Sequence, residues 1–462
     1  MENEEDIYYF ERKSCSSAVK KFILFAAVLI LLLLASAAAG QVYADSTASA
    51  DSTASADSSA STAGKTAAPQ KKVIQVSYSQ GQKGIQKALN KARDHATADR
   101  PYEVVVAAGT YKLNTALHIY SNTELTCEPG TVFKEKVRNN LLKVGRPGVD
   151  KEAHGFYYQN ITINGGIWNR CKLHDSTGIK IAHAANVTLE NAELCNAENS
   201  HLVETAGVNG LYIKNCRFHN SGRTNYGNPG YECVQIDILA KQHFNGYQAL
   251  DSEIDYVSKN IVVENCSFDH VVRTVGSHTA VIGRPFKNVV FKNNTVTNCQ
   301  DAGFYMRNVQ GLRIVGNRIQ SRGTGIQIFN MAYTANGYYL PRRGSRAYTA
   351  SAEKVNGVIA NNTIVSSRGN GIYLLGRRIH KAVRGNSGEA VPKGNYYIGN
   401  VKVKNNVIKT RARGASPILV TDGRNISIVA NKIAGPHKKS SALRINGGSR
   451  GVRIIRNVIR VR

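Results

Sequence analysis

The chain has 462 residues, of which 42% are hydrophobic, enough for a large core. Its 60 Lys and Arg outnumber its 32 Asp and Glu, and the excess lies in residues 301–462, which hold 29 basic and 4 acidic residues. Such a surplus predicts an anionic partner, either a uronate polymer, a phosphate-containing wall polymer or nucleic acid. None of the eight cysteines forms a C-x-x-C pair. We therefore expect buried free thiols rather than a zinc motif, a redox motif or a disulfide framework.

The N-terminal region predicts export. Residues 1–21 are polar and end in two lysines, and an 18-residue apolar run begins at Phe22. Because basic residues precede this run and are scarce after it, we expect residues 1–21 to be cytoplasmic. Residues 22–40 are then a cleaved signal peptide or a retained membrane anchor. Residues 41–72, rich in Ser, Ala, Thr and Asp, predict a disordered tether. The protein is thus expected outside the cell or on its surface, where nucleic acid is not an expected partner.

An internal repeat dominates residues 73–462. After an amphipathic helix expected over Gly84–His95, a unit of Asn or Gly, alternating apolar residues, Asn and a final apolar residue recurs ten times. Six of its nine spacings lie between 23 and 28 residues, and three longer ones fit a coil with an inserted loop. A recurring Asn, as at Asn265, Asn293 and Asn405, suits a left-handed turn. The repeat predicts an all-β fold, a right-handed parallel β-helix of roughly 10–12 coils with an N-terminal helix cap.

A second strand precedes each repeat unit and carries chemically diverse side chains. In the strand before the repeat unit at Asn288 we align Val281 with Phe304, which makes the strand begin at His278. Alternation predicts a buried set: Ile179, Val234, Ile236, Phe304, Met306, Ile326, Ile328, Ile372 and Leu374. It predicts an outward set on one face: Lys180, Glu204, Gln235, Asp237, Tyr305, Arg307, Gln327 and Tyr373. The insertions all leave the same end of these strands, after Leu239, Asn330 and Gly376, so we expect them to wall a groove.

The opening sequences A-A-G-T-Y-K-L, S-N-T-E-L and P-G-T-V-F resemble the start of pectin-lyase-like β-helix proteins. The coils that follow are similar to polygalacturonase-type glycoside hydrolases and to related lyases and epimerases. That family carries paired aspartates, then G-H-G, then R-I-K, on successive coils. Here E-C-V-Q-I-D, G-S-H-T and Y-M-R-N occur in that order. The resemblance implies Glu232 or Asp237 as the acid, His278 as the histidine and Arg307 as the arginine. No Asp-Asp pair is present, and Asn308 stands where the family has lysine.

Two chemistries fit the predicted groove. Glu204 and Asp237, on adjacent coils and two residues out of step, would lie ~8 Å apart, which suits inverting hydrolysis of a glycosidic bond. Elimination or epimerisation would instead use Arg307, His278 and Tyr305 as cation, base and acid. Further substrate contacts are expected from one group of side chains: Gln235, Gln327, Tyr373, Tyr338 and Arg342.

The sequence therefore predicts a protein that binds an acidic, uronate-containing polysaccharide and cleaves or modifies it as a hydrolase, lyase or epimerase. The alternative is a non-catalytic wall-binding or adhesin β-helix. A groove with a facing acid pair would indicate the enzyme, and a purely basic and aromatic groove would indicate the binder. No cofactor or metal site is expected to be required, although Asp251–Asp255 is a possible calcium ligand run. A retained anchor would make the membrane a second partner.

Overall fold

The computed structural model describes residues 70–462 with gaps at 147, 151, 174–175, 223–230, 240–255, 278, 282–283, 331–337, 340–353, 382, 385–389, 392, 437 and 462. These residues fall in the second of two units of the chain, residues 67–462. The predicted export signal and nearly all of the predicted tether lie outside the described residues. Among the residues that are described, no helix is long and apolar enough to cross a membrane.

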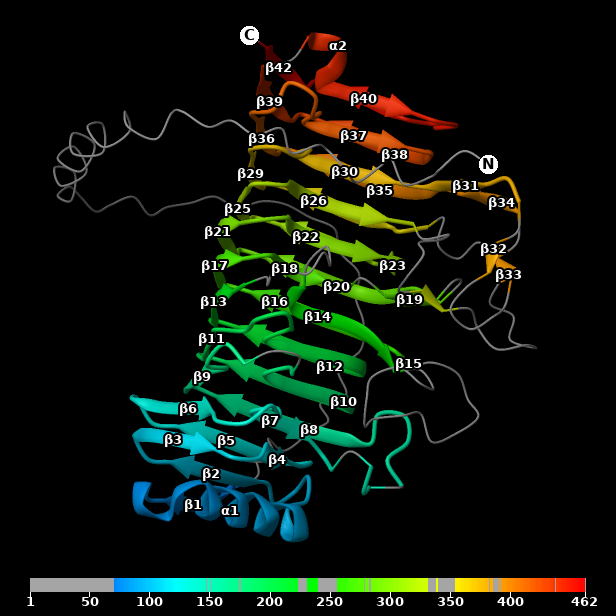
Figure 1. Ribbon diagram of the computed structural model, residues 1–462. Coiled ribbons are helices and arrows are strands. Elements are labelled where there is room, and N and C mark those ends of the chain that lie inside the picture. Colours follow the sequence, from blue (N-terminus) through cyan, green and yellow to red (C-terminus); the bar gives the residue numbers. More distant parts are fainter. Residues whose placement is uncertain are drawn as a thin grey trace, which may run out of the picture. The chain divides into compact units, whose positions relative to one another are not determined.

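A helix closes the N-terminal end of the solenoid. β1 (Lys72–Val76) leads into the 3-10 helix η1 (Tyr78–Gln80) and then α1 (Gly81–His95), which lies beneath the first coil (Figure 1). The buried residues of α1 recur every three or four positions: Ile85, Ala88, Leu89 and Ala92. This spacing places them on one face of the helix. The predicted helix cap is confirmed, although the helix begins at Gly81 rather than Gly84.

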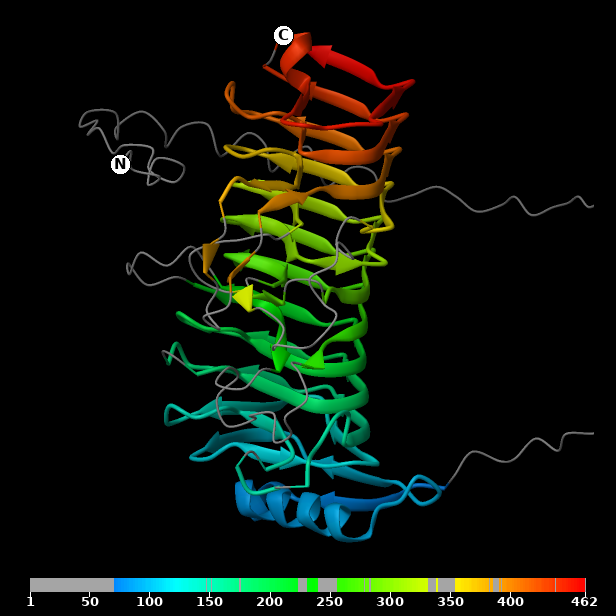
Figure 2. The same cartoon turned by 90° about the vertical axis from the view of Figure 1, so that its right-hand side faces the viewer.

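Each coil contributes three strands. In chain order, the first strand lies in a layer that we name the second arm, the next in the third sheet, and the last, which is the strand before each repeat unit, in the first arm. Parallel pairing joins equivalent strands of successive coils at each position, so the coils stack along one axis (Figures 1 and 2). The third sheet has 12 strands, in agreement with the predicted number of coils. The two arms, together with the short strand β15 (Tyr256–Val257), form one 24-stranded sheet. The arms are joined because β10 (Ile179–Glu190) and β12 (Val203–Lys214) run through both, bending at His183 (φ 50°) and Gly207 (φ 61°).

The strands are distributed over these positions as follows. Besides the first halves of β10 and β12, the first arm contains β4 (Leu117–Ile119), β7 (Leu142–Val144), β14 (Glu232–Leu239), β18 (Arg273–Gly276), β22 (Ala302–Arg307), β26 (Thr324–Phe329), β30 (Ile372–Leu375), β37 (Ile418–Thr421) and β40 (Leu443–Asn446). Besides β1 and the second halves of β10 and β12, the second arm contains β2 (Tyr102–Val106), β5 (Thr123–Cys127), β8 (Tyr158–Asn164), β16 (Lys259–Glu264), β20 (Phe286–Lys292), β23 (Val309–Gln310), β24 (Arg313–Val315), β28 (Gly357–Ala360), β35 (Ile398–Lys404), β38 (Gly423–Val429) and β41 (Arg453–Ile455).

The third sheet contains β3 (Gly109–Leu113), β6 (Thr131–Glu135), β9 (Ile167–Asn169), β11 (Glu193–Cys195), β13 (Arg217–Ser221), β17 (Ser267–Val271), β21 (Thr295–Cys299), β25 (Arg318–Ser321), β29 (Thr363–Ser366), β36 (Val407–Thr410), β39 (Lys432–Gly435) and β42 (Val458–Val461). Short strands outside the coils are β15 (Tyr256–Val257), β19 (Ala280–Val281), β27 (Tyr338–Tyr339), β31 (Arg377–Ile379), β32 (Val383–Arg384), β33 (Ala390–Val391) and β34 (Gly394–Tyr396). A second helix, α2 (Lys439–Ala442), precedes β40.

The core is a continuous column of inward side chains. All nine residues predicted to be buried on the first arm have no exposed surface. On the third sheet, large rings stack between neighbouring coils, with centroids of Phe133 and Trp168 4.3 Å apart and those of Phe218 and Phe268 4.8 Å apart. No coil could bury these side chains alone, so stacking itself stabilises the fold.

Asparagines set the corner between the second arm and the third sheet. Asn265, Asn293 and Asn405 have φ of 54°, 54° and 55°, which confirms the predicted left-handed turns. The residue after the turn is often a second asparagine. On successive coils these asparagines form a hydrogen-bonded ladder that the sequence analysis missed. Each of these side chains accepts hydrogen bonds from the preceding coil and donates to its strand: Asn294, Asn317, Asn362, Asn406, Asn431 and Asn457. The ladder fixes the register of successive coils at this corner.

The seven described cysteines are all free thiols, and only Cys171 among them is exposed. Cys216 and Cys266 stack in successive coils, with the backbone N–H of Cys216 3.4 Å from the Cys266 sulfur. This agrees with the prediction of buried free thiols at equivalent repeat positions. Burial raises the pKa of Cys127 to about 12 and that of Cys299 to about 12, so these two thiols are protonated and inert.

Candidate functional site

The first arm brings most of the predicted site residues onto one face. Strand pairing aligns Glu204 with Gln235, Gln235 with Gly276, and Gly276 with Tyr305. The same ladder continues through Gln327 to Tyr373. Asp237 pairs with Ala206, so it lies two residues out of step with Glu204, as predicted.

The predicted alignment of the strand placed at His278 was wrong. Phe304 lies level with Val275 of β18, because Arg273 pairs with Ala302 and Gly276 pairs with Tyr305. The strand therefore ends at Gly276 and does not begin at His278. Both segments alternate in the same way, but Ala280–Val281 leaves the solenoid to pair with β27. His278 itself lies outside the described residues.

Side chains at the centre of this face have little exposed surface. Exposed fractions are 0% for Gln235, 2% for Asp237, 5% for Tyr305 and 8% for Arg307. Asp237 accepts hydrogen bonds from the N–H of Ile238 (2.7 Å) and from the hydroxyl of Thr279. It is therefore a buried, hydrogen-bonded carboxylate rather than an outward group whose loss would leave folding intact.

Gln235 differs from its neighbours in having no partner. Its amide oxygen and amide nitrogen are both buried, and neither makes a hydrogen bond. An unsatisfied buried amide costs about 1–3 kcal/mol for each group. Such a cost is retained in proteins mainly where a ligand or a water molecule satisfies the group.

Glu232, a predicted catalytic acid, lies in a buried ion-pair cluster. Its carboxylate is 3.0 Å from Nη1 of Arg273, whose Nε is 2.6 Å from Asp301. The Arg273 guanidinium also stacks 3.9 Å above the Tyr305 ring. Burial alone would lower the pKa of Arg273, but the carboxylates of Glu232 and Asp301 raise it above its ordinary value, so Arg273 stays charged. The cluster positions Tyr305, to whose hydroxyl Arg307 donates (2.9 Å).

The remaining predicted acid, Glu204, is engaged as well. Its carboxylate accepts a hydrogen bond from Thr177 (2.8 Å) and lies 3.4 Å from the ammonium of Lys180. Lys180 therefore partly offsets the charge of Glu204, while Glu232 and Asp237 are buried.

Aromatic side chains extend the same face toward the C-terminus. Tyr305 and Phe329 meet edge to face with centroids 5.3 Å apart, and Phe329 and Tyr373 do so at 6.4 Å. Burial raises the pKa of Tyr373, which keeps its phenol neutral. Gln327 is half-buried between these coils. The side chain of Tyr338, all of Arg342 and the calcium candidate Asp251–Asp255 lie outside the described residues.

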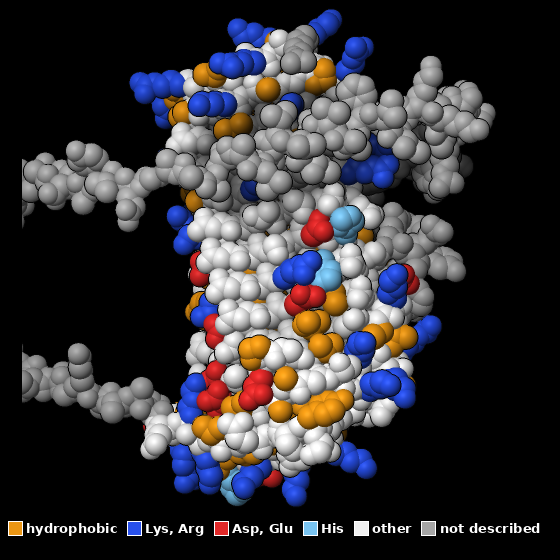
Figure 3. Space-filling model, turned by 90° about the vertical axis from the view of Figure 1, so that its left-hand side faces the viewer, with side chains coloured by type: hydrophobic (Ala, Val, Ile, Leu, Met, Phe, Trp, Pro, Cys, Tyr) orange, Lys and Arg blue, Asp and Glu red, His pale blue; other side chains and the backbone are white. Residues whose placement is uncertain are grey.

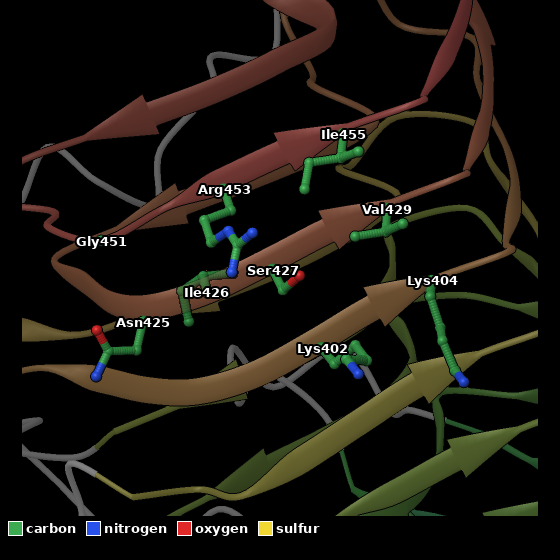
Figure 4. A pocket seen from close by; sticks show the side chains of 9 residues that line it. All are labelled: Lys402, Lys404, Asn425, Ile426, Ser427, Val429, Gly451, Arg453 and Ile455. Carbon is green, nitrogen blue, oxygen red and sulfur yellow. The ribbon is translucent and has the colours of Figure 1, made fainter.

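An open hollow lies elsewhere, on the outer side of the second arm near the C-terminus. Its volume is about 550 Å³, and it crosses β35, β38 and β41 (Figure 4). Nine residues line it: Lys402, Lys404, Asn425, Ile426, Ser427, Val429, Gly451, Arg453 and Ile455. Pairing aligns Lys402 with Ser427 and Ser427 with Arg453, so these two cations lie two coils apart on one line. None of the nine residues is acidic.

This hollow, named the basic hollow, was missed because the sequence analysis followed the first-arm strands. The signal that could have found it was the excess of basic residues after residue 300. Figure 3 shows the same asymmetry on a neighbouring face, where the described charged side chains at the C-terminal end are Lys and Arg, while acidic and basic groups mix nearer the N-terminus. A positive field at this end of the solenoid favours anionic ligands.

Comparison with known proteins identifies the fold. Residues 79–268 match the family described as rhamnogalacturonase A/epimerase, pectate lyase-like, and residues 252–459 match the right handed beta helix region. The surface adhesin PfbA of Streptococcus pneumoniae superposes with a TM-score of 0.53 at 17% identity, over 82% of this chain and 86% of the adhesin.

A mutant tailspike protein of Escherichia coli bacteriophage HK620, in complex with a pentasaccharide, superposes with a TM-score of 0.51 at 13% identity. The match covers 82% of this chain and 62% of the tailspike chain. Comparison with curated proteins gives no match. At these identities the solved structures establish the fold alone, while the two family models together span nearly the whole solenoid and confirm the resemblance found in the sequence. The chain thus has the fold of the right-handed β-helix proteins and is similar to their pectate lyase-like members.

Proposed function

We propose that the protein is exported and binds an acidic polysaccharide through the basic hollow. The observation that carries this proposal is the lining of the hollow, with Lys402, Lys404 and Arg453 and no acidic residue. The proposal requires no cofactor. Two of the matched structures support it: the HK620 tailspike is in complex with a pentasaccharide, and PfbA is a surface adhesin.

The arrangement suits a polymer more than a small molecule. Lys402 and Arg453 are two coils apart, which is roughly 10 Å at the spacing of neighbouring strands. The hollow is partly open to solvent, so a polymer chain can reach it from outside. Arg453 can bind a carboxylate through two parallel hydrogen bonds, and the two lysines add point charges. Ser427 lies between Lys402 and Arg453, and Asn425 lies two residues before it on β38; both offer hydrogen bonds to sugar hydroxyls.

The test is a variant that removes the three cations, Lys402→Gln, Lys404→Gln and Arg453→Gln together. Exposed charge contacts contribute about 0.2–1 kcal/mol each. The three together should weaken binding to an acidic polysaccharide by roughly 3- to 150-fold. Affinity should also fall as salt is raised, because the pairs are exposed. Binding to polygalacturonate, alginate and a neutral glucan is measured by isothermal titration calorimetry.

A matched control loses the same number of charges at the opposite end. Lys83, Lys87 and Lys91 are exposed on α1, and replacing all three with Gln changes net charge equally. The control should bind like the wild type. Equal losses in both triple variants would show that only net charge matters, and undiminished binding in the hollow variant would refute the assignment.

A second function, modification of the bound polysaccharide, is favoured by the first-arm face. The Gln235 amide is buried without a hydrogen-bond partner, and Asp237 lies two residues further along the same strand, β14. A sugar that reached this face would find an amide, a carboxylate, the Tyr305 phenol and Arg307. Product analysis on acidic polysaccharides decides this: unsaturated ends indicate a lyase, and new reducing ends without unsaturation indicate a hydrolase. Binding with unchanged polymer length and composition would indicate a binder alone.

A further inference from the structure

Midway along the solenoid, the outer face of the third sheet gathers three side chains that carry metal-binding atoms. They are Glu193 and Cys195 of β11 and His219 of β13. Figure 3 shows this face, on which acidic, basic and histidine side chains lie together near the middle. The carboxylate oxygen, the sulfur and the imidazole nitrogen all lie within 4.8 Å of one another.

The strand geometry explains why these atoms converge. Glu193 and Cys195 are two residues apart, so they point to the same side of β11, while Leu194 between them points into the core. Cys195 pairs directly with His219 on the next coil. His219 Nε2 is already 2.9 Å from the Glu193 carboxylate. A cation between the three atoms would replace this hydrogen bond without moving the backbone.

The surroundings support the sulfur as a ligand. Nδ2 of Asn196 lies 3.5 Å from the Cys195 sulfur and is fixed by a second bond to Asn169 (3.0 Å). An N–H group aimed at sulfur stabilises a thiolate, as outer-shell donors do at metal sites. Cys195 is 3% exposed, and burial raises its pKa to about 12, so metal binding must displace the thiol proton.

We propose that Glu193, Cys195 and His219 bind one divalent cation of the zinc class. One thiolate, one imidazole and one carboxylate are ligands that Zn²⁺ accepts, and three protein ligands leave a fourth, tetrahedral position for water. The hard ions Ca²⁺ and Mg²⁺ prefer oxygen ligands only, so they do not fit this set. The site joins two successive coils, and it lies on a different sheet from the basic hollow. A search for C-x-x-C spacing could not find it, because its ligands come from two coils.

The neighbouring coil provides a matched control. His270 lies 2.7 Å from the Asp269 carboxylate, so it repeats the imidazole–carboxylate pair without a thiol. Cys171 is the exposed thiol of the described residues, and it is the one available for adventitious metal. Variants at these two positions separate the proposed site from unspecific binding.

The experiment uses the purified full chain with Zn²⁺ and with Co²⁺. We expect one Zn²⁺ per chain to remain after dialysis against weak chelator, and Co²⁺ to give a near-ultraviolet sulfur-to-metal charge-transfer band. Loss of an outer-shell partner costs about 10- to 100-fold in affinity, so loss of a direct ligand should cost at least about 100-fold. Cys195→Ser should also abolish the charge-transfer band, and His219→Ala should weaken Zn²⁺ binding to the same extent. Glu193→Gln should weaken binding while retaining the band.

The controls His270→Ala and Cys171→Ser should retain both the stoichiometry and the band. Circular dichroism confirms that each variant is folded. Absence of Zn²⁺ and Co²⁺ binding to the folded wild type would overturn the proposal. Binding that survives Cys195→Ser, or that is lost in Cys171→Ser instead, would overturn it equally.

Discussion

The buried pair of Glu232 and Arg273 offers a sharp test of how the first arm is held together. Replacing Arg273 with Met keeps much of its apolar stem but leaves the Glu232 carboxylate, which is 0% exposed, without its guanidinium partner at 3.0 Å. Breaking a buried ion pair from one side costs about 3–5 kcal/mol. The second partner, Asp301, has a side chain that is 44% exposed, so its share is at most about 1 kcal/mol. The expected loss is therefore about 3–5 kcal/mol.

The assay is guanidinium unfolding followed by circular dichroism and by the fluorescence of Trp168, the single tryptophan. Coincident transitions would justify a two-state free energy of unfolding. Adding Glu232→Gln to Arg273→Met removes the stranded charge, so the double variant should recover about 2 kcal/mol relative to additive losses. Lys214→Met, which removes a cation 2.9 Å from Glu190 at the surface, should cost under about 1 kcal/mol. A loss below about 1 kcal/mol for Arg273→Met, or no recovery in the double variant, would refute the reasoning.

Two further outcomes follow from the third sheet and its corner. Asn362→Ala removes the acceptor for the backbone N–H and the side-chain amide of Asn317, both at 2.9 Å, and should cost about 2–4 kcal/mol. Asn400→Gly removes an exposed hydrogen bond to Asn356 (3.2 Å) and should cost under about 1 kcal/mol; thermal melting compares the two variants. The second outcome concerns Asp269. Burial alone would raise the pKa of its carboxyl group, but hydrogen bonds with Thr297, His270 and Asn298 lower this pKa from 3.8 to about 2. Because the folded pKa is depressed, this contribution to stability is present above pH 3.8 and is lost as the pH falls toward about 2. Urea midpoints of the wild type and Asp269→Asn should therefore differ most above pH 4 and converge near pH 2, and a constant difference would contradict the assignment.

Much of the solenoid could be predicted from sequence because its periodicity is local. Inward residues such as Val234 and Ile326 are identified by alternation alone, and each coil repeats the pattern. The strand at Arg273–Gly276 was misplaced because the next residues alternate equally well. The two choices are separated by the pairing of β18 with β22 and by the pairing of Ala280–Val281 with β27, and the second contact joins segments far apart in the chain.

The sequence could predict where the candidate site lies, but not which of its side chains are buried or already paired. Register placed Gln235, Tyr305 and Gln327 on one face, since strand pairing follows from the repeat. The pairing of Glu232 with Arg273 spans 41 residues and depends on which side chains meet inside the coil. Sequence cannot show that a carboxylate is already neutralised. The basic hollow likewise depends on the pairing of β35, β38 and β41, which brings its lining residues together, and the excess of basic residues was its only sign in the sequence.

The turns between the second arm and the third sheet differ from the exits of the first arm: the turns keep one length, whereas the exits carry loops of different lengths. Between the second arm and the third sheet, a turn such as Asn293–Asn294 has a fixed length, and an added residue would break ladder bonds to the coils on both sides. The three insertions instead leave the first arm after Leu239, Asn330 and Gly376, where stacking continues beneath them. Foreign peptides grafted at these exits should leave the register of the coils intact. The solenoid is in this sense a display scaffold, whose loops can diversify while its repeat length stays the same.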